Sequence, residues 1–216
     1  MGRSQEPDPP TTEGLRERKR RQTRERIAQS AMALFLDRGF DATTVDDIAA
    51  AADVSKRSFF DYFPAKEDVV AAWQDQFAVT LVAAVAARPA GEALARVVEE
   101  ALTASIIQTA TPQVMAIRQL IYDTPALSAR DQVKYAKLEG ILADALAARA
   151  APGTDPLGIR LLAMVAVGGL RIGAEEGRTR QAGETVEAHV RRVFATLWAN
   201  LREFGHAGGA AGSPPR

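Results

Sequence analysis

Apolar residues recur at spacings of three and four along most of this 216-residue chain, and this period constrains the fold more than any other feature. Such spacing places apolar side chains on one stripe of a helix, whereas strands need alternation. Alternating β-branched runs are few, and Ala, Leu, Arg and Glu, which favour helices, dominate. We predict an all-α protein of about nine helices, over residues 16–38, 45–52, 56–63, 66–87, 92–109, 112–122, 125–150, 155–176 and 184–204.

Composition divides the chain into four parts. Residues 1–15 and 205–216 are rich in Gly, Pro, Ser and other small residues. Such segments bury too little apolar area to offset the entropy lost on ordering, so we predict a disordered N-terminal arm and a disordered tail. Between them we predict a three-helix unit over residues 16–65 and a larger helical unit over residues 66–204. The 47% of apolar residues suffices for a sizeable core.

Charge and composition exclude several classes of protein. The 27 Lys and Arg residues equal the 27 Asp and Glu residues, so attraction to nucleic acid must come from local clustering. The absence of cysteine removes disulfides, thiolate zinc sites and cysteine nucleophiles. His189 and His206 are too scattered for a metal site, and we expect His189 on an exposed helical face. Without a Ser–His or His–acid arrangement or a glycine-rich phosphate loop, we expect no enzyme and no cofactor.

The chain shows no segment that we expect in a membrane. Its polar, proline-rich start lacks the apolar core of a signal peptide. The longest apolar stretch, residues 161–170, lies between Arg160 and Arg171 and is shorter than the roughly 20 residues that span a bilayer. We therefore expect a cytoplasmic protein.

The two short helices predicted within residues 45–63 are joined by a tight turn. Thr44 can cap the first of them with Asp47 in a capping box, Ser55 can cap the second, and Pro64 ends it. Phe59 and Phe63, at i and i+4, are expected in the core. A turn of this kind can present the second helix to a DNA major groove about 12 Å wide.

A cluster of positive charge precedes this segment. Residues 16–26 hold seven basic residues against two acidic ones, a local net charge of +5. Such a cluster alone is often only the solvated face of a long helix. Directly before a helix-turn-helix, it favours contact with phosphates.

The segment over residues 24–70 resembles the TetR family of bacterial transcription regulators. The resemblance is carried by Ile27, Ala31, Leu34, Phe35, Gly39 and Phe40, by the run TTVDDIA over residues 43–49, and by Val54, Ser55, Phe59, Phe60, Tyr62, Phe63, Lys66 and Glu67. It implies phosphate contacts by Thr43 and Thr44 and a phosphate anchor at Lys66. With the basic cluster added, the expected DNA-binding residues are Arg20, Arg21, Arg24, Thr43, Thr44, Ser55, Lys56, Arg57, Ser58, Phe60, Asp61, Tyr62 and Lys66.

Three residues depart from the family pattern. Asp53 stands where glycine is usual, at a turn that needs a left-handed backbone, which Asp tolerates. Phe60 replaces a common tyrosine and so lacks a hydroxyl for a phosphate. Asp61 places a carboxylate on the recognition helix, where it is either repelled by phosphate or accepts a hydrogen bond from cytosine N4.

The resemblance also implies that the last two long helices, over residues 155–176 and 184–204, pair two chains into a homodimer. Residues 161–170 are apolar nearly all round the helix, which indicates burial on two sides. Gly168 and Gly169 would allow another helix to approach closely. The expected interface residues are Leu161, Val165, Gly168, Gly169, Ile172, Val193, Leu197 and Leu201.

The chain is similar to a narrower subgroup related to the mycofactocin-system regulator, through the run MAIRQLIYDTPALSAR over residues 115–130 together with SKRSFFDYFPAKEDVV over residues 55–70. This similarity implies a small-molecule effector, an acyl-CoA or another long apolar ligand. The expected ligand-binding residues are Ile106, Ile107, Met115, Arg118, Ile121, Tyr122 and Leu138. Arg118 could meet an anionic group of the ligand or form a structural ion pair with a residue such as Glu139.

The sequence thus predicts a ligand-responsive DNA-binding regulator, a repressor that binds a palindromic double-stranded operator as a homodimer. The alternative is a small-molecule-binding module that has lost specific DNA recognition. Asp61 and the missing hydroxyl at Phe60 support that alternative.

Overall fold

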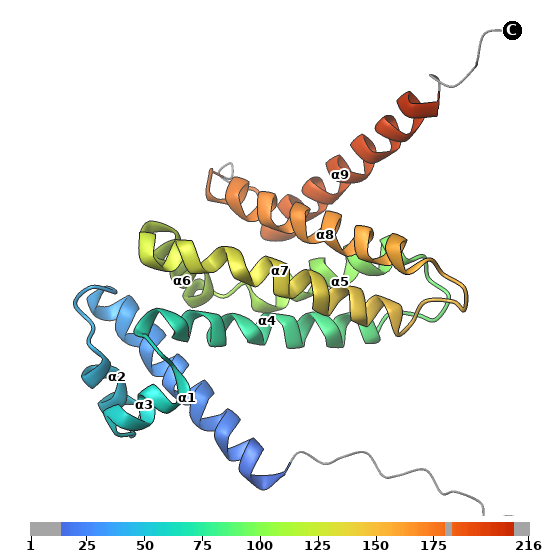
Figure 1. The fold of residues 1–216 in the computed structure, drawn as a ribbon. Helices are drawn as coiled ribbons and strands as arrows, with labels where there is room; N and C mark the ends of the chain where they lie inside the picture. Colours follow the sequence, from blue (N-terminus) through green and yellow to red (C-terminus); the bar gives the residue numbers. More distant parts are fainter. Residues whose placement is uncertain (1–13, 180–182, 210–216) are drawn as a thin grey trace, which may run out of the picture. The chain divides into compact units, whose positions relative to one another are not determined.

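The structure is a computed structural model that describes residues 14–179 and 183–209 (Figure 1). Its described part confirms the all-helical prediction, with helices α1 (Leu15–Arg38), α2 (Val45–Ala51), α3 (Lys56–Tyr62), α4 (Val69–Ala86), α5 (Leu94–Thr109), α6 (Pro112–Asp123), α7 (Pro125–Ala147), α8 (Pro156–Glu176) and α9 (Val186–Gly209). Two short 3-10 turns, Lys66–Asp68 and Gly177–Thr179, precede α4 and follow α8. The predictions for residues 1–13 and 210–216 lie outside the described residues, whereas α9 continues through residues 205–209, which we expected in the tail.

The chain divides into two compact units, Met1–Trp73 and Gln74–Arg216. We call them the N-terminal unit and the body unit. The division falls inside α4, whereas composition alone suggested a boundary after Ala65. The helix α4 therefore contributes residues to both units.

The N-terminal unit is built around one apolar stripe of α1. Ile27, Ala31 and Phe35 are buried there, as the 3.6-residue period predicts. Phe59 and Phe63 are also buried, which confirms them as core residues. The helix α1 ends at Gly39, whose positive φ of 84° is a conformation that favours glycine.

The core of the body unit draws on α4, α5, α7, α8 and α9. Its fully buried members include Leu81, Leu102, Leu142, Ala163 and Val167. Arg149, directly after α7, donates to the carbonyls of Val85, Arg88 and Pro89 at 2.5, 3.3 and 2.6 Å. This guanidinium thus satisfies acceptors where α4 ends.

Two helices are long and apolar enough to cross a membrane, over Lys66–Ala86 and Pro156–Glu176. The core helices of globular proteins pass the same test of length and composition. Both helices here supply buried residues to the core of the body unit, among them Val85 and Ala166. Of the most apolar 18-residue stretch of each helix, 28% and 33% is buried, so only part of this apolar surface belongs to the core.

Candidate nucleic-acid interface

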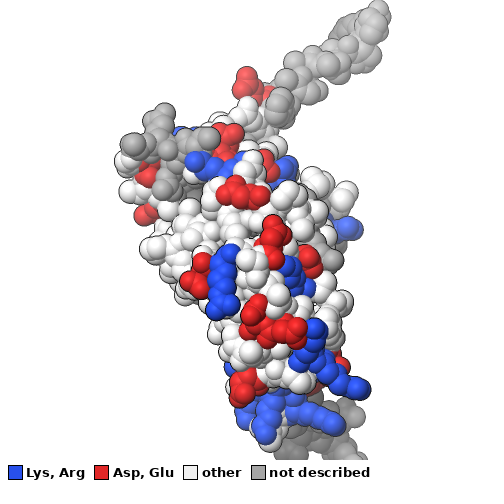
Figure 2. All heavy atoms as spheres, turned by 90° about the vertical axis from the view of Figure 1, so that its left-hand side faces the viewer, with Lys and Arg blue, Asp and Glu red and all other residues white. Residues whose placement is uncertain are grey.

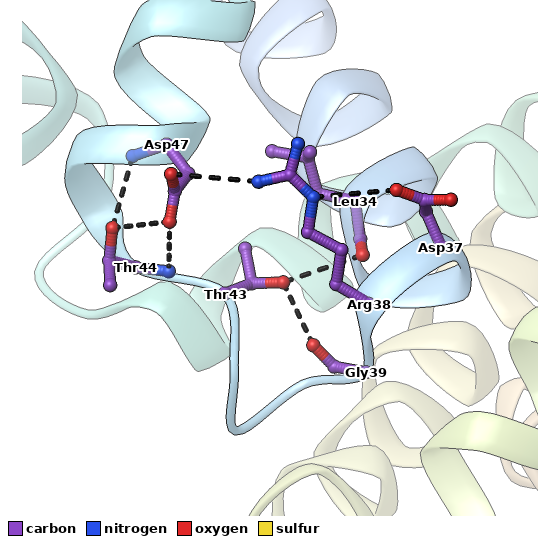
Figure 3. Close-up of polar contacts among 7 residues, drawn as sticks. All are labelled: Leu34, Asp37, Arg38, Gly39, Thr43, Thr44 and Asp47. Atoms are coloured by element: carbon purple, nitrogen blue, oxygen red, sulfur yellow. Dashed lines mark hydrogen bonds and ion pairs between the residues drawn. The ribbon is translucent and has the colours of Figure 1, made fainter.

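The start of α2 is held by a complete capping box (Figure 3). The Asp47 amide donates to the Thr44 hydroxyl at 3.1 Å, and the Thr44 amide and hydroxyl donate to Asp47 Oδ2 at 2.9 and 2.6 Å. The bond from the Thr44 hydroxyl, then that from its amide, lowers the pKa of Asp47 below its ordinary value. Arg38 approaches the other carboxylate oxygen at 3.7 Å. The predicted cap is confirmed, and the Thr44 hydroxyl is engaged within it.

The expected phosphate contact of Thr43 is wrong for its side chain. Thr43 has no exposed surface, and its hydroxyl donates to the Gly39 carbonyl at 2.8 Å, with the Leu34 carbonyl also within 3.4 Å (Figure 3). The hydroxyl thus satisfies acceptors at the end of α1. Because Thr43 and Thr44 are adjacent and chemically identical, the sequence alone could not show which of the two hydroxyls is buried.

Asp53 forms the turn between α2 and α3 with a φ of +50°, in the left-handed region. This matches the expectation that an aspartate replaces glycine there because it tolerates that conformation. The amides of Asp53 and Val54 donate to the carbonyls of Ala50 and Ala49 at 3.2 and 2.9 Å. These bonds close the turn and fix the angle at which α3 begins.

The helix α3 has a buried face and an exposed face. Ser55 caps it, since its hydroxyl accepts from the Ser58 amide at 3.0 Å, and the two hydroxyls lie 2.9 Å apart. Phe59 faces the core, while the opposite edge carries exposed side chains: Lys56, Arg57, Phe60 and Asp61. The outward edge predicted for this helix is therefore exposed in the N-terminal unit.

These exposed side chains differ in how they are held. The Lys56 ammonium lies 2.8 Å from Asp46 of α2 in a solvent-exposed ion pair. Within residues 14–179 and 183–209, the Arg57 side chain has no hydrogen-bond or ion-pair partner. Phe60 is 48% exposed despite being apolar, with its ring edge-on to Phe59. Arg57 can thus turn both of its outer nitrogens toward a ligand, as bidentate recognition requires.

Two arginines of α1 lie over aromatic rings at the end of α3. The guanidinium of Arg20 is 5.8 Å from the Tyr62 ring centre, and that of Arg24 is 5.1 Å from the Phe63 ring centre. Cation–π contacts of this kind are worth about 0.5–1 kcal/mol at exposed sites. They place the basic part of α1 beside the recognition helix. Figure 2 shows Lys and Arg side chains gathered at the lower end of the view, where α1 begins in Figure 1.

Lys66 has an internal role that differs from the expected phosphate anchor. Its ammonium donates to the carbonyls of Phe40 and Thr43 at 2.8 and 3.0 Å and lies 4.2 Å from the Phe40 ring centre. Two of the three ammonium donors are therefore occupied by the turn between α1 and α2. The physical reason is that the segment after α3 passes close to the turn between α1 and α2, so the Lys66 ammonium reaches carbonyls of that turn.

Comparison with known proteins matches both units. Residues 27–73 match the family described as "Bacterial regulatory proteins, tetR family", and residues 88–202 match the "MftR C-terminal domain". The chain belongs to the TetR family. The HTH-type transcriptional regulator TcmR of Streptomyces glaucescens is 34% identical over 160 residues, which cover 68% of this chain and 71% of TcmR. TetR-family proteins are transcription regulators and not enzymes.

Other relatives match less of the sequence or only the fold. The repressor DhaR of Mycobacterium sp. (strain GP1) is 41% identical over 44 residues, 20% of this chain and 22% of DhaR. A TetR-family regulator from Mesorhizobium loti superposes with a TM-score of 0.56 at 18% identity, covering 84% of this chain and 96% of that one. A regulator from Pseudomonas aeruginosa PAO1 gives 0.58 at 19% identity, covering 86% and 93%. These two structures share the TetR fold.

The residues expected to pair two TetR chains divide between two faces. Leu161, Ile172 and Leu201 are exposed, and Val165 and Gly168 are half-buried. Val193 and Leu197 are also half-buried, and Gly169 is buried against its own chain, where an added Cβ would lie 3.1 Å from Leu197. A Cβ on Gly173 would likewise meet Val193 at 3.2 Å. Gly169 and Gly173 thus allow α8 to approach α9 within one chain, whereas a Cβ on Gly168 would meet nothing within 4 Å, so its role in a dimer stays a prediction.

Some of the residues expected to bind a ligand are buried, and others are exposed. Ile106, Ile121 and Leu138 are buried in the body unit, and Arg118 is half-buried. Ile107, Met115 and Tyr122 are exposed by 43%, 40% and 52%, so they do not line an interior. The reason is helical phase: Ile107 and Tyr122 directly follow the buried Ile106 and Ile121, and Met115 lies two residues before the buried Ile117. An open groove of about 500 Å³ lies elsewhere and is lined by Ala95, Glu99, Ala195, Trp198, Leu201 and Arg202.

His189 was expected on an exposed face, and this prediction is wrong. The side chain is buried, with Nε2 2.7 Å from the Gly173 carbonyl and Nδ1 3.0 Å from an Arg192 nitrogen. Because a carbonyl oxygen only accepts, Nε2 donates to Gly173, while Nδ1 lies between the Arg192 nitrogen and a Glu184 carboxylate oxygen 3.5 Å away. A sequence signal was available: His189, Val193 and Leu197 are spaced by four, on one helical stripe.

Proposed function

We propose that this TetR-family regulator is a repressor that binds a palindromic DNA operator as a homodimer and is released by a small, apolar or acyl-type ligand. The observation that carries the DNA-binding part is the exposed edge of α3, held rigidly by the caps at Thr44 and Ser55. Repression is supported by the names of relatives that match the helix-turn-helix, the repressor DhaR and the Staphylococcus aureus negative regulator IcaR.

Arg57 is the residue that we assign to reading a base. An exposed guanidinium near the start of a recognition helix can bond guanine O6 and N7 in the major groove, the commonest specific contact. Lys56, Ser55 and Ser58 lie on the same leading end, and Tyr62 follows at the other end of α3. Exposed Phe60 offers an apolar surface to a thymine methyl group. For Asp61, both a bond from cytosine N4 and a role as bystander fit its exposed position.

A homodimer is supported by an exposed apolar stripe on α8. Leu157, Leu161, Met164 and Ile172 are 60%, 47%, 47% and 50% exposed, at spacings of four, three and eight that keep them on one face of the helix. Large apolar side chains aligned in this way mark protein interfaces. A second copy of the chain can cover the stripe symmetrically, and a permanent interface of this kind buries on the order of 2,000 Å².

The ligand is assigned to the body unit, among Ile106, Ile121 and Leu138, with Arg118 near an anionic group. The match of residues 88–202 to the MftR C-terminal domain agrees with the subgroup whose resemblance implies an acyl-CoA or another long apolar compound. Because α4 has residues in both units, we infer that ligand binding changes the distance between the two recognition helices through α4. A coupling of about 1–3 kcal/mol changes DNA affinity about 5- to 150-fold. The protein acts in the cytoplasm, where its operator lies.

The DNA-binding proposal is tested by Arg57→Ala. Since Arg57 is exposed, this variant should keep the melting temperature of the wild type and lose the preference for its operator, selected from a pool of random duplexes. A wild-type protein with no sequence preference would favour the alternative, a ligand-binding module without DNA recognition. Loss of folding together with binding would contradict the exposure assigned to Arg57.

The ligand proposal is tested with palmitoyl-CoA against free coenzyme A. Palmitoyl-CoA should raise the melting temperature and release the operator, because its long chain binds the core and its headgroup meets Arg118. Free coenzyme A lacks the chain and serves as the control. Equal effects of both compounds, or none, would contradict an apolar ligand.

A further inference from the structure

The first turns of α1 extend beyond the core of the N-terminal unit. Every residue of Leu15–Gln22 is exposed, and the first buried residue of the helix is Ile27. At 1.5 Å per residue, the helix from Leu15 to Ile27 rises about 18 Å. We call residues 15–22 the cationic arm, because they hold five basic residues and one acidic residue, a net charge of +4.

Glu17 is the acidic residue in the first turn of the cationic arm, where it is favourable, but the basic residues around it oppose their own helix. Arg16 and Arg20 are four residues apart, where like charges repel each other. Cations in a first turn also face the positive end of the helix dipole, and Gly14 supplies no side-chain cap. Within the described residues, the side chains of Arg16, Arg18 and Lys19 have no bonded partner. The arm therefore carries a charge arrangement that an external polyanion would stabilise.

The recognition segment cannot supply general attraction to DNA. Residues 44–63 hold four acidic side chains, Asp46, Asp47, Asp53 and Asp61, against Lys56 and Arg57, a net charge of −2. Binding to DNA regardless of sequence is almost entirely electrostatic. A segment of negative net charge repels the phosphates on average, so the attraction must come from a neighbouring positive element.

The cationic arm is placed to supply that attraction. Arg20 and Arg24 contact the rings of Tyr62 and Phe63, so the arm runs past the C-terminal end of α3. We propose that Arg16, Arg18 and Lys19 bind phosphates of the duplex beyond the bases that α3 reads, and that they provide most of the sequence-independent affinity for DNA. The proposal rests on the DNA-binding function proposed above and divides it between two elements, with α3 for sequence and the arm for attraction.

The test is a triple variant, Arg16→Gln, Arg18→Gln and Lys19→Gln, in the full-length chain. Glutamine keeps a helix propensity similar to that of Arg and Lys. The matched control, Arg96→Gln, Lys137→Gln and Arg191→Gln, removes three exposed cations of the body unit, where side chains are 62%, 57% and 45% exposed. Affinity for a duplex without the operator is measured between about 50 and 200 mM salt.

The arm variant should flatten the plot of log affinity against log salt by about 2.7 per bound chain, since each lost phosphate contact removes about 0.9. The ratio of operator to non-operator affinity should remain within about threefold of the wild type. The control should keep the wild-type slope. An arm variant that behaves like the control overturns the proposal, as does one that loses operator preference while its non-operator affinity is unchanged. A wild-type chain that binds no duplex overturns the DNA-binding function as well.

Discussion

The replacement Lys66→Met distinguishes an internal role of this lysine from a role in binding phosphate. Methionine keeps most of the apolar stem, so the change removes chiefly the ammonium group. That group donates to the Phe40 and Thr43 carbonyls at 2.8 and 3.0 Å. Its loss leaves both half-buried acceptors without this donor.

The magnitude follows from these contacts. A hydrogen bond from a charged donor contributes about 1.5–3 kcal/mol when shielded, and the contact with the Phe40 ring adds about 0.5–1 kcal/mol. Lys66 is only half-buried, so competition with water reduces the total. We expect a loss of about 2 kcal/mol in the free energy of unfolding, which lowers the melting temperature by about 4–8 °C in a chain of this size.

The assay combines thermal melting with the salt dependence of DNA binding, measured well below the melting temperature. Lys56→Met is the matched control, because its exposed ion pair with Asp46 contributes about 1 kcal/mol or less. Lys66→Met should lower the melting temperature and keep the wild-type dependence of DNA affinity on salt. Lys56→Met should keep the wild-type melting temperature and flatten that salt dependence. A Lys66→Met variant of wild-type stability with a slope flattened by about 0.9 would refute the internal role.

Three further predictions concern stability. Thr103→Val should raise the unfolding free energy by about 1 kcal/mol, because the Thr103 hydroxyl is buried without a partner in the described structure; Ser105→Ala, which removes a hydroxyl that donates to Ala101 at 2.7 Å, should not. Gly173→Ala should lower the free energy of unfolding, since its Cβ would lie 3.2 Å from two methyl groups of Val193. Gly140→Ala, with open space around it, should raise that free energy by about 1 kcal/mol, and chemical denaturation measures both. The folded-state pKa of Asp47 is lowered, so its contribution to the free energy of unfolding is complete above about pH 4 and is lost as the pH falls through that lowered pKa. Between about pH 6 and 2.5, the melting temperature of Asp47→Asn should therefore fall less steeply with pH than that of the wild type. Equal slopes for the two proteins would contradict this prediction.

The helices and the caps could be predicted from the sequence because their causes are local. The spacing of Ile27, Ala31 and Phe35, the Thr44–Asp47 pair and the left-handed turn at Asp53 each depend on residues a few positions apart. Interactions between residues so close in the chain follow from their spacing in the sequence, so they can be predicted from it.

The roles of Lys66 and His189 depend on contacts between distant parts of the chain. Lys66 bonds to carbonyls 26 and 23 residues earlier, and His189 bonds to a carbonyl 16 residues earlier. The sequence shows which side chains can donate hydrogen bonds, but the tertiary packing determines which acceptor each of them meets. The same limit explains why Ile107 and Tyr122, one residue from buried positions, were assigned to an interior that they do not reach.

The central claim is that two copies of the exposed edge of α3 read two half-sites in one duplex. It is tested most directly by selecting bound duplexes from a random pool and weighing the resulting complex by native mass spectrometry. We predict an inverted repeat with half-sites about 34 Å apart, or a multiple of that distance, bound by two chains or a multiple of two. Enrichment of no sequence, or of a single unrepeated site bound by one chain, would contradict the account.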